Sequence, residues 1–377
     1  MEILLSAGSY LLTDNVPYGE GQVCYNFLKH MQHFNFHVVT PIANIRQRLP
    51  NVTIYETGGY KNPFDPSVVD AMKFALLSYK ASKSVLEKNY MDIVHHFLPA
   101  QYPRIASFLP FDRKIMTKYP FVVGPISFPT YWPRSSRGML LDYLSKPFFE
   151  RSLAEADFII TQTRHTAELV QSVFPNKSIV TVPLGVDTEV FKPNNPVIEL
   201  SNILAVANLF EKKGINYLIQ AFYYVNKEFP DVVLRIIGTG PHEKYLKELT
   251  NSLGLSHKVV FFGNVSRDDL IKYYNEATIF CSPSLVEPFG VVILEAMACG
   301  KAVVATKTEG AKEIIHDGEN GLLVDIGDPK SIAKALLFLL HNRALLDAFS
   351  SCARDNCKKR FSWELLAQQY STVYHSI

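Results

Sequence analysis

Short apolar runs alternate along the chain with longer stretches in which apolar residues recur at helical spacing. A short apolar run is typical of a strand buried on both faces, and the helical stretches provide the crossovers that parallel strands require. The pattern therefore predicts an α/β protein with parallel sheets covered by helices. The expected strands lie at 2–5, 36–40, 93–97, 121–124, 158–161 and 179–182 in the first half, and at 202–207, 232–237, 259–262, 279–282, 302–305 and 321–324 in the second.

The two sets of strands predict two Rossmann-like domains, because 377 residues exceed what one hydrophobic core usually serves. We expect their boundary in the Pro- and Asn-rich stretch 191–196, which gives an N-terminal domain of residues 1–195 and a C-terminal domain of residues 196–360. Residues 361–377 predict a final helix with Ser362 as its N-cap. Doubly wound sheets bind ligands at the carboxyl ends of their strands, so a cleft between the two domains is the expected ligand site.

The composition is that of an ordinary globular protein, with 47% hydrophobic and 20% charged residues. No apolar run approaches the roughly 18 residues of a membrane-spanning helix, and the N-terminal residues lack the basic start of a signal peptide. The five cysteines form no Cys-x-x-Cys pair and are odd in number, which favours free thiols in a reducing compartment. We therefore expect a cytoplasmic protein.

The charge distribution allows two interpretations of a basic, aromatic segment in the first domain. A net charge of +2 does not mark a nucleic-acid-binding protein. Within 101–151, however, eight basic residues stand against three acidic ones and alternate with aromatic residues, which is the composition of a surface that rests on anionic lipid. A solvated face beside aromatic residues of an acceptor site is an equally good interpretation. The eight basic residues are Arg104, Arg113, Lys114, Lys118, Arg134, Arg137, Lys146 and Arg151.

The most informative motif is a pair of glutamates, Glu287 and Glu295, with seven residues between them. If a helix starts near Phe289, the two backbones lie roughly 12 Å apart along its axis. A hydrolytic carboxylate pair needs a separation of about 5 to 9.5 Å. The spacing therefore favours two carboxylates that hold hydroxyl groups at opposite ends of one long polar ligand. Two ordinary acids on a surface helix are the alternative.

Two turns could bind such a ligand through their backbones. The start of the helix after Glu287 would present the free amides of Phe289, Gly290 and Val291 to an anion or a polar sugar. After the first strand, Gly19 and Gly21 open a second helical stretch in the same manner. For these two glycines a plain strand-to-helix turn is the alternative.

The string from Ser284 to Ala305 resembles the Glu-x7-Glu signature of the family 4 glycosyltransferases, which are retaining sugar transferases of the GT-B fold. The resemblance is close over residues 178–325 and looser in the first domain and the final helix. It implies a nucleoside diphosphate sugar as donor, no cofactor and no metal ion. It also implies that Glu287 positions and polarises the donor sugar, while Glu295 accepts hydrogen bonds from the nucleotide ribose.

Other segments extend this resemblance to the remainder of the donor. Residues 203–214 resemble the family segment whose arginine and lysine neutralise the donor phosphates, and a cation there would stabilise the charge that grows on the leaving group. Lys213 matches the lysine, whereas Asn208 stands where the arginine is expected, and a solvated Lys213 is the alternative. Val265 lies in a loop similar to the one whose backbone reads the nucleotide base. Gly19 and Gly21 resemble the family's Gly-Gly loop, with one residue inserted between them.

Two histidines, His95 and His96, end a predicted strand of the first domain. An imidazole there could orient an acceptor hydroxyl or contact the donor phosphate, because it both donates and accepts near neutral pH. A strand-end histidine that only satisfies local backbone groups is the alternative. The family often carries a histidine after a later strand, where this chain has Gly124-Pro125, which directs attention to His95 and His96.

Together these features predict a hexosyl transferase that moves a sugar from a nucleoside diphosphate to a hydroxyl group of a glycan, lipid or small-molecule acceptor, as in polysaccharide or glycolipid biosynthesis. Contact with the cytoplasmic face of an anionic membrane stays open. So do two other classes: a nucleotide-sugar epimerase of the same two-domain build, and a non-catalytic nucleotide-sugar-binding protein, which Asn208 suggests. No Asp-x-Asp or Walker motif is present, so a metal site is not expected.

Overall fold

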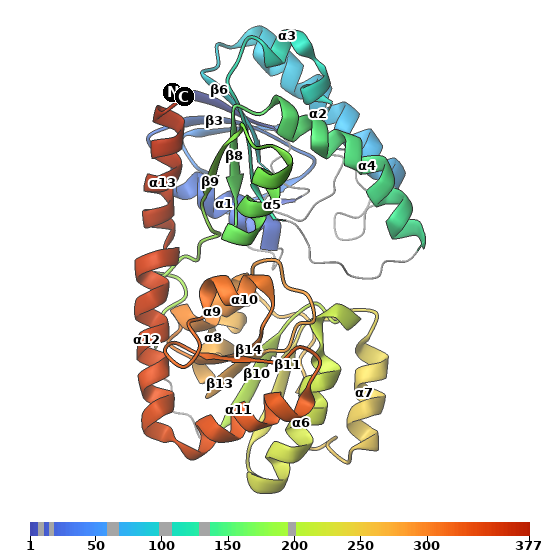
Figure 1. Cartoon of the computed structure of the whole chain (residues 1–377), viewed down its shortest axis with the longest axis vertical. Helices are drawn as coiled ribbons and strands as arrows, with labels where there is room; N and C mark the ends of the chain where they lie inside the picture. Colours follow the sequence, from blue (N-terminus) through green and yellow to red (C-terminus); the bar gives the residue numbers. More distant parts are fainter. Residues whose placement is uncertain (7–10, 15–18, 59–67, 98–107, 128–135, 195–200) are drawn as a thin grey trace. The chain divides into compact units, whose positions relative to one another are not determined.

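The computed structural model contains two parallel sheets covered by helices, and it describes residues 1–6, 11–14, 19–58, 68–97, 108–127, 136–194 and 201–377. Figure 1 shows each sheet with helices on both of its faces. The first sheet has the strand order β5-β3-β1-β6-β7-β8-β9 and the second the order β12-β11-β10-β13-β14-β15. Both sheets are doubly wound, because the order runs outward in two directions from β1 and from β10. The predicted fold class is confirmed.

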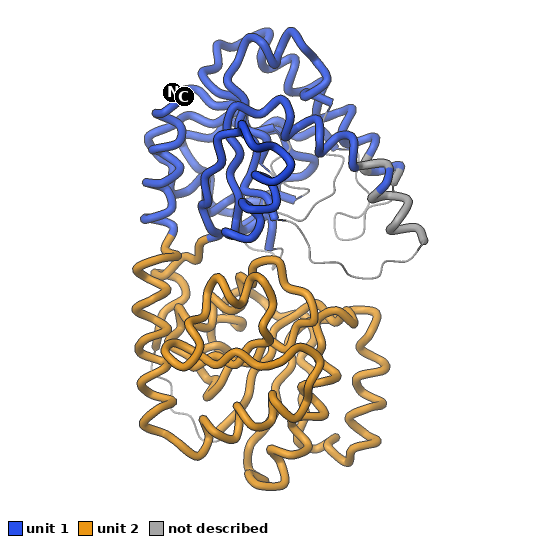
Figure 2. Tube along the Cα trace, viewed as in Figure 1, with its two compact units in different colours: residues 1–129, 133–184, 363–377 blue, residues 130–132, 185–362 orange. Residues whose placement is uncertain are grey.

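The first compact unit contains the described residues of 1–184 together with 363–377 (Figure 2). Its strands are β1 (Glu2–Ser6), β2 (Leu12–Thr13), β3 (Asn35–Thr40), β4 (Ala43–Asn44), β5 (Val52–Glu56), β6 (Ile93–Phe97), β7 (Phe121–Ile126), β8 (Phe158–Thr161) and β9 (Ser178–Thr181). Its helices are α1 (Gly19–His30), α2 (Val68–Lys88), η1 (Leu109–Phe111), α3 (Arg113–Met116), α4 (Ser136–Glu155), α5 (Arg164–Val173) and α13 (Trp363–His375).

The second unit contains the described residues of 185–362. Its strands are β10 (Asn202–Val206), β11 (Val233–Ile237), β12 (Val259–Phe261), β13 (Ile279–Ser282), β14 (Ala302–Thr306) and β15 (Leu322–Val324). Its helices are η2 (Glu211–Lys213), α6 (Ile215–Glu228), α7 (Glu243–Ser252), α8 (Arg267–Glu276), α9 (Val291–Ala298), α10 (Glu309–Ile314), α11 (Pro329–His341) and α12 (Arg343–Phe361).

Successive side chains of each strand point to opposite faces of its sheet and pack there against the covering helices. In the second sheet, Ile203 and Ile279 join an apolar cluster with helix α6, whereas Phe280 points to the other face and contacts the ring of Tyr274 on α8. In the first sheet, Val94 joins the cluster that contains Phe121 and the α4 residue Phe149. Every strand predicted from an apolar run is present, with ends that differ by at most two residues.

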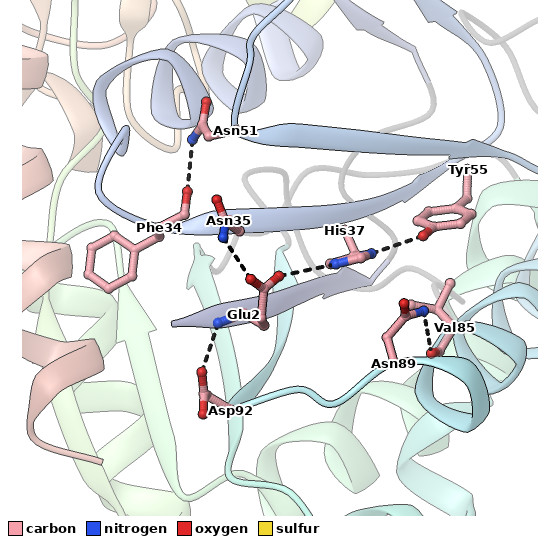
Figure 3. A network of polar contacts seen from close by, with 9 residues as sticks. All are labelled: Glu2, Phe34, Asn35, His37, Asn51, Tyr55, Val85, Asn89 and Asp92. Atoms are coloured by element: carbon pink, nitrogen blue, oxygen red, sulfur yellow. Dashed lines mark hydrogen bonds and ion pairs between the residues drawn. The ribbon is translucent and has the colours of Figure 1, made fainter.

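The sequence reasoning missed β5, an edge strand. Its residues are only half-buried or exposed, so they do not form the continuous apolar run that identifies a central strand. A polar network helps to join β5, β3 and β1 (Figure 3). The imidazole of His37 on β3 lies 3.2 Å from a carboxylate oxygen of Glu2 and 2.9 Å from the hydroxyl of Tyr55 on β5. Glu2 also accepts a hydrogen bond from Asn35, and its amide donates to Asp92 before β6.

The final helix, α13, packs within the first unit. The ring of Trp363 stacks on His30 of α1, and Tyr370 contacts Phe27 of the same helix. The predicted final helix is thus present, and it begins at Trp363, directly after Ser362. The predicted boundary at 195/196 falls in the stretch 195–200, outside the described residues, so the domain limits and the cleft between the domains stay predictions.

None of the helices in the described ranges has the length and apolar character needed to cross a membrane. All five cysteines carry free thiols, as the sequence predicts. Four of them are buried, and Cys352 on α12 is exposed.

Candidate functional site

The carboxyl edge of the second sheet brings two predicted site segments together. Strands β10 and β13 are paired in parallel, so the turn after β10 and the loop after β13 leave the sheet side by side. The amide of Leu285 donates to the carbonyl of Lys212 at 2.8 Å, which joins the two segments directly. Gly214 permits this approach, because a Cβ there would lie 2.0 Å from the carbonyl oxygen of Pro283.

Lys213 and Glu287 face each other across this junction. The Nζ of Lys213 lies 2.6 Å from Oε2 of Glu287, which is the length of a charge-assisted hydrogen bond. Their side chains are 21% and 11% exposed, so both charges are shielded from solvent yet remain at the surface of the edge. An ammonium that could meet phosphate and a carboxylate that could accept sugar hydroxyls therefore lie in direct contact.

Two glycines shape the backbone that carries Glu287. Gly290 has a φ of 104°, in the left-handed region, and caps the N-terminus of α9. A Cβ there would lie 3.0 Å from Ile293 and 3.4 Å from the Cγ of Glu287. Gly310, on α10, donates its amide to the carbonyl of Glu287 at 3.0 Å, and a Cβ on it would lie 2.1 Å from the carbonyl oxygen of Phe289. The Glu287 loop is therefore held from both sides by glycines at which a Cβ would crowd its neighbours.

Helix α9 starts two residues after the expected start near Phe289, directly after Gly290. It runs from Val291 to Ala298, and its first amides have no acceptor within the helix. It ends in a Schellman motif, because Gly300 donates to Met297 and Lys301 donates to Ala296. The three positions expected to supply amides differ in side-chain environment, since Phe289 is buried against Phe361 whereas Val291 is only half-buried.

Glu295 occupies a different environment from Glu287. It lies on α9, is 8% exposed, and accepts a hydrogen bond of 2.7 Å at Oε2 from the hydroxyl of Tyr274 on α8. Burial raises the pKa of Glu295 to about 7, and the Tyr274 hydrogen bond and the charge of Arg267 oppose that rise. The same burial and the nearby carboxylate raise the pKa of Tyr274 well above its ordinary value. Glu295 therefore exchanges a proton near neutral pH, whereas Tyr274 stays a hydrogen-bond donor.

The other predicted donor residues of this unit lie on neighbouring loops of the same edge. Asn208 follows β10 and is exposed, while its carbonyl accepts from the amide of Phe210. Val265 is half-buried in the loop between β12 and α8. That loop is joined to the end of β11 by a bridge in which Gly238 donates to the carbonyl of Gly263 at 2.8 Å.

In the first unit, Gly19 and Gly21 lie in the first turn of α1, where the sequence places the start of a helix. Gly19 is exposed, and open space surrounds the position that a Cβ would take. Gly21 is buried. Because the positions of the two units relative to each other are not described, contact of these glycines with a donor held by the second unit stays a prediction.

His95 is fully engaged in the core of the first unit. Its Nδ1 lies 2.6 Å from the hydroxyl of Tyr374 on α13, and its Nε2 lies 2.9 Å from the carbonyl oxygen of Gly124 on β7. The residue has no exposed surface, and burial lowers its pKa to about 3. With both ring nitrogens occupied, this neutral imidazole holds α13 and β7 to β6, so the geometry favours the structural interpretation of His95.

His96 points to the opposite face of β6. It is 2% exposed, its ring lies near that of Phe121, and burial lowers its pKa to about 4. Neither of its ring nitrogens has a hydrogen-bond partner within the described ranges, and the hydroxyl of Ser78 on α2 is in the same situation. Since buried polar groups normally find partners, His96 keeps the capacity to bind a water or a ligand hydroxyl.

Sequence reasoning missed two residues of the second-unit site, Tyr274 and Gly310. Tyr274 stands in an ordinary helical pattern, and a tyrosine at helical spacing usually indicates only a core position. Gly310 is a single glycine on α10, and a lone glycine carries little functional information in a sequence. A glycine next to the end of β14, at the edge that carries Glu287, was the available signal.

Two further expectations stay predictions. Within the described ranges, no three His, Cys, Asp or Glu side chains cluster closely enough to hold a metal ion. Arg113, Lys114 and Lys118 are exposed around the short helix α3, whereas Arg104 and Arg134 lie outside the described residues. Contact of this region with an anionic membrane is therefore untested.

A family model described as "Glycosyl transferases group 1" matches residues 187–356, which include the whole Lys213–Glu287 site. The chain is 34% identical over 238 residues to the uncharacterized glycosyltransferase MJ1607 of Methanocaldococcus jannaschii, and the match covers 59% of this chain and 61% of that protein. It is 25% identical to MJ1178 of the same organism over 93% of both chains. It is 29% identical to the N-acetyl-alpha-D-glucosaminyl L-malate synthase of Bacillus anthracis, over 59% of this chain and 61% of the synthase. With MJ1607 and the synthase, the match thus spans about three fifths of each relative.

Solved structures share the fold along the entire chain. Sucrose-phosphate synthase from Thermosynechococcus elongatus superposes with a TM-score of 0.78 at 19% identity, covering 100% of this chain and 98% of that one. Anabaena HepE, solved in complex with UDP and glucose, gives a TM-score of 0.71 at 19% identity and covers 100% of both chains. The fold is therefore GT-B, as the resemblance of the Glu-x7-Glu segment implies.

Proposed function

We propose that this chain is a member of the glycosyl transferases group 1 family, whose model matches residues 187–356, and that it moves a hexosyl group from a nucleoside diphosphate sugar to an acceptor hydroxyl, with retention and without a metal ion. The observation that supports this most is the contact of 2.6 Å between Lys213 and Glu287 at the edge of the second sheet. In this proposal the ammonium of the pair faces the diphosphate and the carboxylate faces the sugar, which are the two parts of the donor that separate in the reaction.

The proposed donor lies along this edge, with its ribose at Glu295 and its sugar at Glu287. The diphosphate contacts Lys213 and the first amides of α9, where the helix dipole favours an anion. When the sugar leaves, negative charge accumulates on the outer phosphate, and the ammonium of Lys213 stabilises that charge more in the transition state than in the ground state. Asn208, where the resemblance implies an arginine, donates a hydrogen bond to the phosphates but supplies no charge.

Retention follows in this proposal from departure and attack on the same face of the sugar. Glu287 accepts hydrogen bonds from sugar hydroxyls and favours the positive charge that develops on the ring. Its contact with Lys213 anchors its side chain, which suits a positioning group. The acceptor hydroxyl attacks the anomeric carbon, the bond to the phosphate oxygen breaks, and the hydroxyl proton passes to the departing phosphate.

The first unit supplies the acceptor side in this proposal. Gly19 and Gly21 cover the donor through the start of α1, and His96 contacts the sugar or the acceptor with a ring nitrogen that has no partner among the described residues. The printed names of relatives support donor and acceptor classes only in outline. HepE is solved with UDP and glucose, and the Bacillus anthracis relative is named for L-malate. A nucleoside diphosphate hexose and a small-molecule, lipid or glycan hydroxyl therefore define the first substrates to try.

The test begins with binding. Thermal stabilisation by UDP, GDP, ADP and their hexose conjugates identifies the base, because a ligand bound only by the folded state raises the melting temperature. The stabilising donor is then incubated with an acceptor panel that includes L-malate, simple sugars and phosphatidylinositol, and release of the nucleoside diphosphate is measured. We expect release that depends on the acceptor, and a glycosylated product of retained anomeric configuration.

Three results would contradict the proposal, each in a different manner. Interconversion of the sugar with donor alone would indicate an epimerase. Donor binding without turnover across the whole panel would indicate a binding protein. Loss of activity in EDTA that Mg²⁺ restores would contradict the metal-independent mechanism while leaving the transfer itself intact.

A further inference from the structure

Glu295 receives one hydrogen bond from the described side chains, and it comes from the neighbouring helix. The hydroxyl of Tyr274 on α8 donates to Oε2 of Glu295 on α9 at 2.7 Å. Tyr274 has no exposed surface and Glu295 is 8% exposed, so water competes little for this bond. The bond occupies Oε2 and leaves Oε1 as the oxygen with accepting capacity.

Tyr274 is fixed where it stands. Its ring packs edge-on against Phe191, with 6.0 Å between the ring centroids, and in a tilted arrangement against Phe280 of β13, with 5.7 Å between the centroids. The next residue, Asn275, anchors the end of α8, since its carbonyl accepts from the ammonium of Lys301 and its side-chain oxygen accepts from the amide of Asn194. Because neither the ring nor the helix end is free to turn, the phenol defines one direction for the carboxylate of Glu295.

We infer that Tyr274 is a positioning residue for nucleotide binding, holding Oε2 of Glu295 so that Oε1 accepts the hydroxyl groups of the ribose. This inference rests on the proposed function, in which Glu295 meets the ribose. It assigns to Tyr274 a part of nucleotide recognition, although the side chain touches no ligand itself. A tyrosine that served only the core would need its ring but not its hydroxyl.

The same bond affects the charge of Glu295. Burial raises the pKa of that carboxyl to about 7, and the Tyr274 hydrogen bond and the Arg267 charge lower it. The thiol of Cys299 on α9 also lies within electrostatic reach, and Lys301 and Arg354 act on that thiol. Removal of the Tyr274 hydroxyl therefore raises the pKa of Glu295 further, so the ionised carboxylate that accepts two ribose hydroxyls forms at higher pH.

The experiment compares wild type, Tyr274→Phe, Glu295→Gln and the matched control Tyr273→Phe, which alters the adjacent tyrosine of the same helix. Calorimetry measures the Kd of each for UDP, or for the nucleoside diphosphate that stabilises the wild type, and for its 2′,3′-dideoxy analogue, from pH 6 to 9. We expect wild type to prefer the ribonucleotide and Tyr274→Phe to lose about tenfold of that preference, which is the value of one charged hydrogen bond. Affinity for the dideoxy analogue stays unchanged, and the pH midpoint of ribonucleotide binding moves upward.

The outcomes separate the inference from its premise. If Glu295→Gln leaves the ribose preference intact, or no nucleotide binds, the proposed role of Glu295 fails and the inference fails with it. If Glu295→Gln abolishes the preference while Tyr274→Phe preserves both preference and pH midpoint, only the role of Tyr274 is overturned. Tyr273→Phe should match wild type in both readouts, and an equal loss there would reveal a general effect on α8.

A second variant keeps the test decisive if Tyr274→Phe does not fold. Incorporation of 3,5-difluorotyrosine at position 274 retains the ring and the hydroxyl but makes the hydroxyl a stronger donor. We expect the pH midpoint of ribonucleotide binding to move downward, because the stronger bond favours ionised Glu295. A midpoint equal to that of wild type would overturn the inference.

Discussion

Strands β13 and β6 occupy equivalent places in the two sheets, each beside the central strand where the order reverses, yet their ends are built for different tasks. After β13, Glu287 contacts Lys213 of the turn that follows β10, at a partly exposed edge. At the end of β6, His95 and His96 are buried and neutral, and both ring nitrogens of His95 are hydrogen-bonded within the core. The same fold position therefore supports a charged site in one unit and a packed polar core in the other.

This difference shows why sheet topology alone does not identify the residues that bind a ligand. The carboxyl edge of a doubly wound sheet is where ligands bind, but only side chains with uncommitted groups can meet them. In the second unit, glycines hold the backbone so that a charged pair stays at the surface. In the first unit, α13 packs onto the sheet and accepts the contact of His95 through Tyr374. We therefore expect the donor to bind mainly at the second unit, while the histidines of the first unit serve mainly its core.

The largest effect is expected from Lys213→Met. This change removes the cation that is proposed to face the leaving phosphate, and it removes the ion-pair partner of Glu287. By comparison with the loss of one electrostatic stabilising group, we expect kcat to fall by about 10²–10³-fold. Release of nucleoside diphosphate measures this, with Lys244→Met, an 89% exposed lysine, as the matched control. If Lys213→Met retained more than half of the wild-type turnover, the placement of the donor at the second unit would be wrong.

A smaller loss is expected from Gly290→Ala, which displaces Glu287 without changing any charge. Gly254→Ala is its control, because both glycines have positive φ but the Cβ of Gly254 would meet open space. Each change should cost about 1–2 kcal/mol of stability through the left-handed backbone. Only Gly290→Ala should reduce turnover, by roughly tenfold or more, since its Cβ would lie 3.0 Å from Ile293 and 3.4 Å from Glu287. Equal turnover in the two variants would show that the position of Glu287 is unimportant.

Substitution of the two histidines should lower the stability of the protein more than its activity. His95→Leu leaves the Tyr374 hydroxyl and the Gly124 carbonyl unpaired, which should lower the free energy of unfolding by about 1–3 kcal/mol for each. His96→Leu breaks no hydrogen bond within the described residues and should cost less. Urea unfolding of both variants checks the order. A larger loss for His96→Leu would contradict the structural role given to His95.

The final prediction is a dependence of stability on pH. Burial lowers the pKa of His95 to about 3 and that of His96 to about 4, below the value of about 6.5 in the unfolded chain. Between those values the unfolded state binds more protons, so the free energy of unfolding rises with pH and is lost as pH falls from about 6.5 toward 4. Each histidine contributes up to about 1.4 kcal/mol per pH unit there. The slope for His96→Leu should be lower than that for wild type by this amount, and an unchanged slope would contradict the burial of a neutral His96.

The fold was predictable from the sequence because its central strands are buried on both faces. The apolar runs of β6 and β13 predict both ends of each strand correctly, whereas the half-buried edge strand β5 has no such run. The left-handed backbones of Gly290 and Gly300 set the two ends of α9, whereas the motif alone predicts a start near Phe289, two residues early.

The candidate site was predictable only where one segment carries its own pattern. Glu287 and Glu295 share such a segment, but the contact of Lys213 with Glu287 joins residues 74 positions apart in sequence. The contact of Tyr274 with Glu295 depends on the packing of two helices, and the engagement of His95 depends on a helix 279 residues away. The spacing of residues along the chain does not predict contacts between such distant residues. The contacts of Tyr274 and His95 can therefore be identified only in the folded structure.

The central claim is that Glu287 serves the donor sugar at the edge of the second sheet. Its most direct test is the rate of nucleoside diphosphate release from the donor that stabilises the protein, measured for wild type, for Glu287→Gln and for the exposed control Glu319→Gln. The account predicts that Glu287→Gln lowers kcat by at least about 100-fold while nucleoside diphosphate alone binds within a few-fold of wild type, and that Glu319→Gln keeps full activity. Full turnover in Glu287→Gln would contradict it.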